Sequence, residues 1–135
     1  IIASFLKGAT MIPEPVFDVQ AVLGRIAAER VSMLPGPPTL FLSILNDPAR
    51  DSFDLSSLRV AVTGAAAIPV SMIERMRDEL TFTNIITAYG LTEATGTVTM
   101  CRPEDDPETI ALTSGRAIPE TEVRWAWPSS CPVTV

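Results

Sequence analysis

Apolar residues recur at helical spacing in three stretches of the chain, which begin behind Asp18, at Pro38 and behind Pro69. Asp18 is a suitable N-cap, and proline is suited to the first turn of a helix. Within each stretch the apolar positions lie three or four residues apart, which is the spacing of one helix face. The inward-facing residues are Val19, Val22, Leu23, Ile26, Ala27; Leu40, Phe41, Ile44, Leu45; and Met72, Ile73, Met76, Leu80. We therefore expect three amphipathic helices.

Short apolar runs alternate with these helices and predict strands at residues 9–12, 31–34, 59–63 and 84–88. They are rich in β-branched residues and bounded by proline, glycine or polar residues. Residues 1–7 have the character of a last helical turn closed by Gly8. Beyond Arg102 we expect a loop until residues 122–127, where alternation predicts another strand. The order predicts an α/β fold with a mostly parallel sheet flanked by helices.

The amino-acid composition argues against several classes of function. The 135 residues are enough for one domain, and 47% hydrophobic residues are typical of a folded chain. A net charge of −6 argues against a nucleic-acid partner, and the absence of histidine excludes His-based triads within the chain. Cys101 and Cys131 lack metal-ligand spacing. No apolar run is long enough for a membrane span and no signal peptide is recognisable, so we expect a soluble cytoplasmic protein.

Two predicted loops lie where open α/β sheets bind ligands, at the carboxyl ends of strands. Residues 63–67 are nearly without side chains, which suits either close ligand approach or simply a tight turn. Residues 88–97 combine a tyrosine that can stack, a glycine that permits close approach, a threonine that can bind phosphate and a glutamate that can hold Mg²⁺. Their alternative reading is a helix start with Thr92 as N-cap.

The segment Tyr89-Gly90-Leu91-Thr92-Glu93 resembles a core motif of the adenylate-forming superfamily, which includes acyl-CoA synthetases, aryl-CoA ligases, luciferase and peptide-synthetase adenylation domains. Residues 63–66 are similar to its glycine-alanine adenine loop. Residues 114–119 resemble its glycine-arginine-proline segment, and residues 34–39 its proline-rich turn. Because the matches occur in order, residues 1–124 are identified as an internal fragment of the large N-terminal AMP-binding (adenylation) domain of an acyl-CoA synthetase, a partial copy of that domain.

The resemblance implies a nucleotide site. Gly64, Ala65 and Ala66 would contact the adenine of ATP or AMP, and the ring of Tyr89 would stack on it. Gly90 would lie beside the same nucleotide.

The resemblance also implies catalytic and acyl-binding roles. Thr92 would bind phosphate, and Glu93 would help to hold Mg²⁺. Gly90 and Leu91 would border the carboxylate of the acid, with Gly115 on a neighbouring wall. The implied reaction joins a carboxylic acid, for which an aliphatic or fatty acid is favoured, to ATP as acyl-AMP and then transfers the acyl group to coenzyme A.

Some expected parts are missing from these residues. The family's phosphate-gripping segment and catalytic lysine have no counterpart, and Lys7 is the only lysine. Residues 125–135 match nothing in the family, as a frameshifted tail would. We therefore expect the isolated fragment to be inactive and its exposed sheet edges to favour self-association.

Other readings remain open. One is a non-catalytic remnant with weak adenine-nucleotide binding, and another is an unrelated α/β interaction module. The acidic run Glu104-Asp105-Asp106 is interpreted as a solvated loop rather than a metal site.

Overall fold

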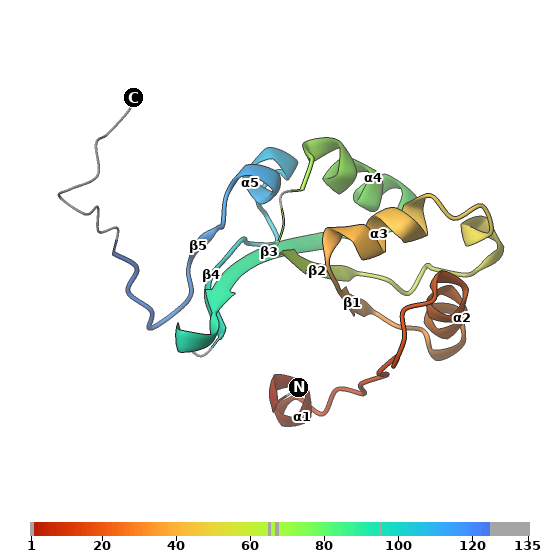
Figure 1. The fold of residues 1–135 in the computed structure, drawn as a ribbon, viewed down its shortest axis with the longest axis horizontal. Helices are drawn as coiled ribbons and strands as arrows, with labels where there is room; N and C mark the ends of the chain where they lie inside the picture. The colour runs from red at the N-terminus through yellow and green to blue at the C-terminus, as the bar shows by residue number, and fades with distance from the viewer. Residues whose placement is uncertain (1, 65, 67, 95, 125–135) are drawn as a thin grey trace.

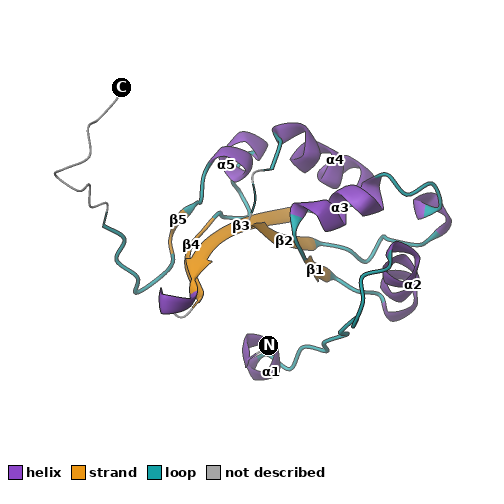
Figure 2. Cartoon of the chain, viewed as in Figure 1, coloured by secondary structure: helices purple, strands orange, loops and turns teal. Residues whose placement is uncertain are grey.

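The computed structural model describes residues 2–64, 66, 68–94 and 96–124, with backbone only for residues 2 and 3. Its centre is a five-stranded sheet of order β1-β2-β3-β4-β5. The pairs β1–β2 and β2–β3 are parallel, whereas β3–β4 and β4–β5 are antiparallel. The strands are β1 Met33–Pro35, β2 Val60–Gly64, β3 Asn84–Leu91, β4 Gly96–Met100 and β5 Arg116–Ala117. The α/β fold class is confirmed, with a mixed sheet (Figure 2).

Helices cover one face of this sheet. Figure 1 shows α3, α4 and α5 on the same side, α2 beside the β1 edge and α1 apart from these layers. Two 3₁₀ turns, η1 Arg50–Ser52 and η2 Thr92–Ala94, complete the described elements. The α-helices are α1 Ile2–Leu6, α2 Val19–Glu29, α3 Pro38–Leu45, α4 Val70–Leu80 and α5 Pro107–Leu112. No helix in the described part of the chain is long and apolar enough to cross a membrane.

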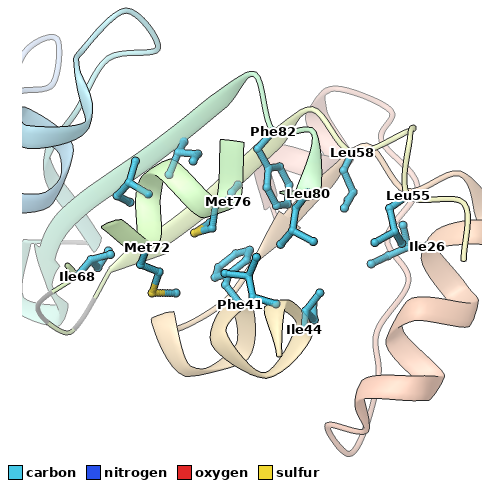
Figure 3. Close-up of a cluster of buried hydrophobic side chains, with 14 of the residues drawn as sticks. Ile26, Phe41, Ile44, Leu55, Leu58, Ile68, Met72, Met76, Leu80 and Phe82 are labelled. Carbon is cyan, nitrogen blue, oxygen red and sulfur yellow. The ribbon is translucent and has the colours of Figure 1, made fainter. Parts of the chain in front are cut away.

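The core lies between the helices and the sheet. Figure 3 shows side chains from α3 and α4 pointing toward one another. Phe41 of α3 meets Phe82 edge to face, with ring centroids 5.9 Å apart, and both rings are buried. Such a pair adds roughly 0.5–1.5 kcal/mol beyond the burial of its area. The core therefore fixes α3 and α4 against the strands that precede the site.

Strand periodicity divides the sheet into two unlike faces. Ala61 of β2 and Ile85 of β3 are fully buried beneath the helices. Val60, Val62 and Ile86 alternate with them and are only partly buried. We call these three residues the open face, because α3, α4 and α5 all lie on the other side (Figure 1). The sheet thus has one packed face and one partly exposed apolar face.

Most predicted elements are confirmed. The Asp18 carboxylate accepts a hydrogen bond from the Ala21 N–H at 2.8 Å, as expected of an N-cap. The inward residues of the three helices are buried or partly buried.

Three predictions at the ends of the chain were wrong or go untested. Residues 9–12 form no strand, since the prolines that follow prevent a ladder and no described strand lies beside them. The expected loop after Arg102 contains α5 and β5. No strand is present at residues 122–124, and residues 125–127 lie outside the described part.

Candidate functional site

A cleft of about 460 Å³ lies at the carboxyl ends of β2 and β3. The β2–α4 connection contributes Gly64, Ala66 and Ile68 to its lining, and β3 contributes residues 87–90. The opposite wall consists of α5 and the turn after it, through residues 110, 111, 113 and 114. The structure thus brings together the two segments, around Gly64 and Tyr89, that the sequence separates by one helix.

The cleft forms where β3 changes its partner. Gly64 is the last residue of β2 and pairs with Ala88, whereas β3 continues to Leu91. Beyond Ala88, β3 pairs only with the antiparallel β4. On the β2 side, residues 89–91 therefore have no strand partner among the described residues. The backbone groups of Tyr89 and Gly90 border the cleft and can hydrogen-bond a ligand.

Tyr89, Gly90 and Leu91 belong to a strand and not, as predicted, to a loop after it. Tyr89 is 53% exposed, so its side chain is accessible to a ligand. Gly90 serves the hairpin itself, because a Cβ there would lie 2.8 Å from Thr97 Cα and nearer still to the Gly96 carbonyl. This backbone contact excludes any residue with a side chain at position 90, whether or not a ligand is present.

Thr92 and Glu93 lie in η2, at the tip of the β3–β4 hairpin. The alternative prediction of a helix capped by Thr92 is therefore wrong. Both side chains are exposed, and neither lines the cleft, nor does Leu91.

The hairpin tip also allows a test of the implied metal. Described residues contain no cluster of three or more His, Cys, Asp or Glu that could enclose a metal. A single exposed carboxylate at Glu93 fits the way Mg²⁺ is usually held, by one or two carboxylates together with phosphate oxygens and waters.

The segment after β2 is close to the β3 backbone. A Cβ at Gly64 would lie 2.9 Å from the Ala88 carbonyl oxygen, so the glycine permits this approach. Ala66 lines the cleft, while Ala65 lies outside the described residues. The hydroxyl of Thr63, one residue earlier, is buried and has no hydrogen-bond partner in the part of the chain that the structure describes.

Gly115 is the last residue of the wall formed by α5 and the turn after it, and does not itself line the cleft. Its φ is +74°, and a Cβ there would collide with the backbone between Met100 and Cys101. Its neighbour Ser114 does line the cleft. The glycine thus lets the chain turn tightly against β4 and places Ser114.

The acidic run is only partly solvated. Glu104 and Asp106 are exposed, but the side chain of Asp105 is 8% exposed, contrary to prediction. Its carboxylate accepts a hydrogen bond from the Arg102 N–H at 2.7 Å and lies 3.8 Å from Arg116. Asp106 caps α5 by accepting from the Thr109 N–H, a bond that lowers the pKa of its carboxyl. This run therefore positions α5.

Sequence reasoning missed the wall opposite the Gly64 and Tyr89 segments and the floor at Thr87. The hydroxyl of Thr87 is buried, donates to the Ile110 carbonyl oxygen at 3.1 Å and lies 3.0 Å from the sulfur of Cys101, a free, buried thiol. A threonine in an otherwise apolar buried strand was the available signal. The wall gave a weaker signal, Asp106 before Pro107, which is a capping residue before a first-turn proline.

The chain resembles known proteins in sequence and in fold. The sequence model of the family described as AMP-binding enzyme matches residues 1–129. A 3-[(3aS,4S,7aS)-7a-methyl-1,5-dioxo-octahydro-1H-inden-4-yl]propanoyl:CoA ligase of Rhodococcus jostii (strain RHA1) is 58% identical over 119 residues, which are 88% of this chain and 23% of that protein. The ligase of the same name from Mycobacterium tuberculosis (strain ATCC 25618 / H37Rv) is 54% identical over 93% of this chain and 25% of its own length. The chain thus spans about a quarter of the length of these curated relatives.

Solved structures share the fold. The N-terminal domain of FACL13 from Mycobacterium tuberculosis superposes with a TM-score of 0.77 at 29% identity, over 86% of this chain and 29% of that one. O-succinylbenzoate coenzyme A synthetase (MenE) from Bacillus subtilis, solved in complex with ATP and magnesium ion, gives a TM-score of 0.72 at 26% identity, over 87% and 23% of the two chains.

Proposed function

Because the chain belongs to the AMP-binding enzyme family, we propose that it forms the adenine-facing part of the nucleotide site in an ATP-dependent acyl-CoA ligase. The observation that carries the proposal is the cleft, in which Gly64, Ala66, Tyr89 and Gly90 meet at the carboxyl ends of two parallel strands. Adenine would lie between the nearly bare β2–α4 connection and the exposed ring of Tyr89. Ala65 would belong to the same contact.

The hairpin tip would serve the phosphates. Thr92 would donate a hydrogen bond to a phosphate oxygen, and Glu93 would provide a carboxylate oxygen for Mg²⁺. Mg²⁺ held there would neutralise charge on the phosphates as the α-phosphate is attacked. Gly90 and Leu91 would border the carboxylate of the acid, with Gly115 behind Ser114 on the facing wall.

The proposed reaction has two steps. A carboxylate oxygen attacks the α-phosphorus of ATP, forming acyl-AMP and releasing pyrophosphate. The thiolate of coenzyme A then attacks the acyl carbon and releases AMP, leaving the thioester. Lys7 is the only lysine of the chain and does not line the cleft, so we propose that these residues do not carry out the first step by themselves. ATP–pyrophosphate exchange above background with the chain alone would contradict this.

We further propose an aliphatic acid as substrate, and a ring-bearing propanoate before a straight-chain fatty acid. The support is the name of the two relatives that share more than half of their matched residues with this chain. The free, buried thiol of Cys101 accords with a reducing compartment, and we propose the cytoplasm. The family model extends to residue 129, so of the atypical tail, residues 125–135, we propose that only residues 130–135 lie outside the family domain.

Binding of AMP tests the proposal directly. Tyr89 is the only tyrosine, so its ring protons give unique NMR signals. We expect AMP to shift these signals upfield and Tyr89→Leu to weaken binding. Loss of base stacking costs roughly 1–3 kcal/mol, or about 5- to 150-fold in Kd. Tyr89→Phe keeps the ring and should bind as the wild type does. Equal binding by the Leu and Phe variants would refute the stacking role.

A chimera tests the whole reaction. The matched part of this chain would replace the corresponding 119-residue segment of the Rhodococcus jostii ligase. We expect the chimera to form the thioester of that ligase's propanoate, and Glu93→Gln within it to lower kcat and raise the Mg²⁺ requirement. A folded, AMP-binding chimera without thioester formation would limit this chain to nucleotide binding.

A further inference from the structure

The wall of the cleft opposite the nucleotide segments, residues 109–115, is joined to the sheet through two buried threonines. Thr87 Oγ1 of β3 donates to the Ile110 carbonyl oxygen at 3.1 Å. Thr99 Oγ1 of β4 donates to the Ser114 carbonyl oxygen at 2.5 Å. The two threonines are 6% and 9% exposed, so water cannot readily take the place of either hydrogen-bond partner, and losing one of these bonds costs free energy. Each end of the wall therefore has one side-chain tether to a different strand.

The wall is a small unit with its own internal hydrogen bonds. Thr113 Oγ1 donates to the Thr109 carbonyl oxygen at 2.7 Å and accepts from the Gly115 N–H at 3.1 Å. Its helix α5 has six residues, too few to be stable without tertiary contacts. Ile110, 1% exposed, anchors the unit in the core, but an apolar contact does not fix its direction. The two tethers add directional restraints from the sheet to those that Asp105 and Asp106 provide at the start of α5.

We propose that Thr87 and Thr99 are positioning residues that set the distance between this wall and the Gly64 and Tyr89 segments, and thereby the affinity of the cleft for an adenine nucleotide. The proposal rests on the proposed function for the identity of the ligand. Ile110, Ala111, Thr113 and Ser114 line the cleft, so a displacement of the wall changes its width directly. Thr99 donates to the wall, and Thr87 has two acceptors within reach, the Ile110 carbonyl oxygen and the Cys101 sulfur, so neither hydroxyl has a proton free for the nucleotide.

Isosteric substitutions separate this role from packing. Thr87→Val and Thr99→Val remove the hydroxyls and keep the shape, whereas Thr87→Ser and Thr99→Ser keep the hydroxyls. Thr97→Val is the matched control, since Thr97 is exposed and two residues from Thr99 on the same strand. The readouts are amide hydrogen exchange of residues 109–115 and the Kd for AMP, both on the full chain.

We expect each valine variant to exchange residues 109–115 about 3- to 10-fold faster and to bind AMP more weakly by a similar factor, the usual effect of losing one hydrogen bond. The serine variants should restore both values, and Thr97→Val should change neither. If residues 109–115 exchange at the wild-type rate in both valine variants, the proposal is overturned. Faster exchange with unchanged AMP affinity would overturn it as well.

The proposed function fails separately, if the wild-type chain binds no AMP. In that case the exchange of residues 109–115 still decides whether the two hydroxyls hold the wall. If a valine variant does not fold, the corresponding serine variant and the second valine variant decide the outcome.

Discussion

Gly90 belongs to the Tyr89–Glu93 motif, and the fold explains why this position is glycine. Its lack of a side chain is required by the β3–β4 hairpin, whose backbone at Gly96 and Thr97 occupies the space of a Cβ. The motif suggested that glycine permits a ligand to approach. A loss of ligand binding in a Gly90 variant would therefore report on the hairpin as well as on contact with the ligand.

Two glycine-to-alanine substitutions should have opposite effects. Gly90→Ala forces backbone atoms apart and should lower the free energy of unfolding by about 1–3 kcal/mol. Gly24→Ala lies inside α2, where the new Cβ meets only Phe53 at 3.9 Å. It should raise that free energy by up to about 1 kcal/mol, because alanine loses less backbone entropy in a helix. Urea unfolding measures both, and a Gly90→Ala chain as stable as the wild type would contradict the hairpin role.

Thr63→Val should stabilise the protein. The hydroxyl is buried and without a partner among the described residues, so valine of the same shape removes a desolvation penalty of about 1 kcal/mol. Thr87→Val, which removes a bonded hydroxyl on the neighbouring strand, should instead destabilise. Urea unfolding midpoints of the two variants provide the comparison. Destabilisation by Thr63→Val would mean that its hydroxyl is hydrogen-bonded in solution.

At the scale of elements, the sequence predicted the features that the spacing of apolar residues and helix capping determine, such as the buried faces of the three longer helices. The face of α4 with Met72, Ile73 and Met76 is buried as expected. In contrast, β3 extends to Leu91 because β4 pairs with it. That pairing depends on a hairpin that no local sequence pattern predicted. The helix α5 is too short for a period to be recognised.

The ion pairs of Glu79 connect α4 to η1 and make this junction sensitive to acid. Its carboxylate accepts from Arg75 Nε at 2.7 Å and from Arg50 Nη1 at 2.5 Å. These two guanidinium groups, Arg75 first, lower the pKa of Glu79 from 4.5 to about 2. Because the folded pKa is lowered, the stabilisation is complete above pH 4.5 and is lost as the pH falls toward 2.

Glu79→Gln should therefore be less stable than the wild type at pH 7, and the difference should shrink as the pH falls from about 4.5. Urea unfolding midpoints between pH 7 and pH 3 measure it. Glu74→Gln is the control, since Glu74 is exposed on the same helix and forms no ion pair among the described residues. A difference between wild type and Glu79→Gln that is constant with pH would exclude this linkage.

For the whole molecule, charge and the open face act against each other. The chain has a net charge of −6 at pH 7 and a pI of about 4.5. Near pH 4.5 its electrostatic repulsion vanishes, while Val60, Val62 and Ile86 remain partly exposed. Self-association should accordingly be stronger at pH 4.5 than at pH 7.5, which sedimentation velocity measures.

A lysine at the sheet edge should counter this association. Met33 in the edge strand β1 is 53% exposed, and charged edge residues oppose strand pairing. Met33→Lys should reduce the association more than Ala28→Lys, which makes the same change in charge at an exposed position of α2. Equal effects of the two variants would attribute the association to net charge alone.

The candidate site was predictable in part. Residue types around Gly64 and Tyr89, each following a predicted strand, indicated two segments that a parallel sheet brings to one edge. The third side of the cleft comes from residues 110–114, whose position depends on tethers to buried threonines rather than on their own pattern. A wall held by side-chain hydrogen bonds of this kind can be recognised only in the folded structure.

The change of partner along β3 has a further consequence for local unfolding. Residues 84–88 share the parallel ladder with β2, whose opening requires much of the core to open. Residues 89–91 depend on a hairpin pair alone. The tip that carries Thr92 and Glu93 can thus open as a small cooperative unit of low stability while the α/β body remains folded. Its amides should therefore exchange by this sub-global route, faster than those of residues 84–88.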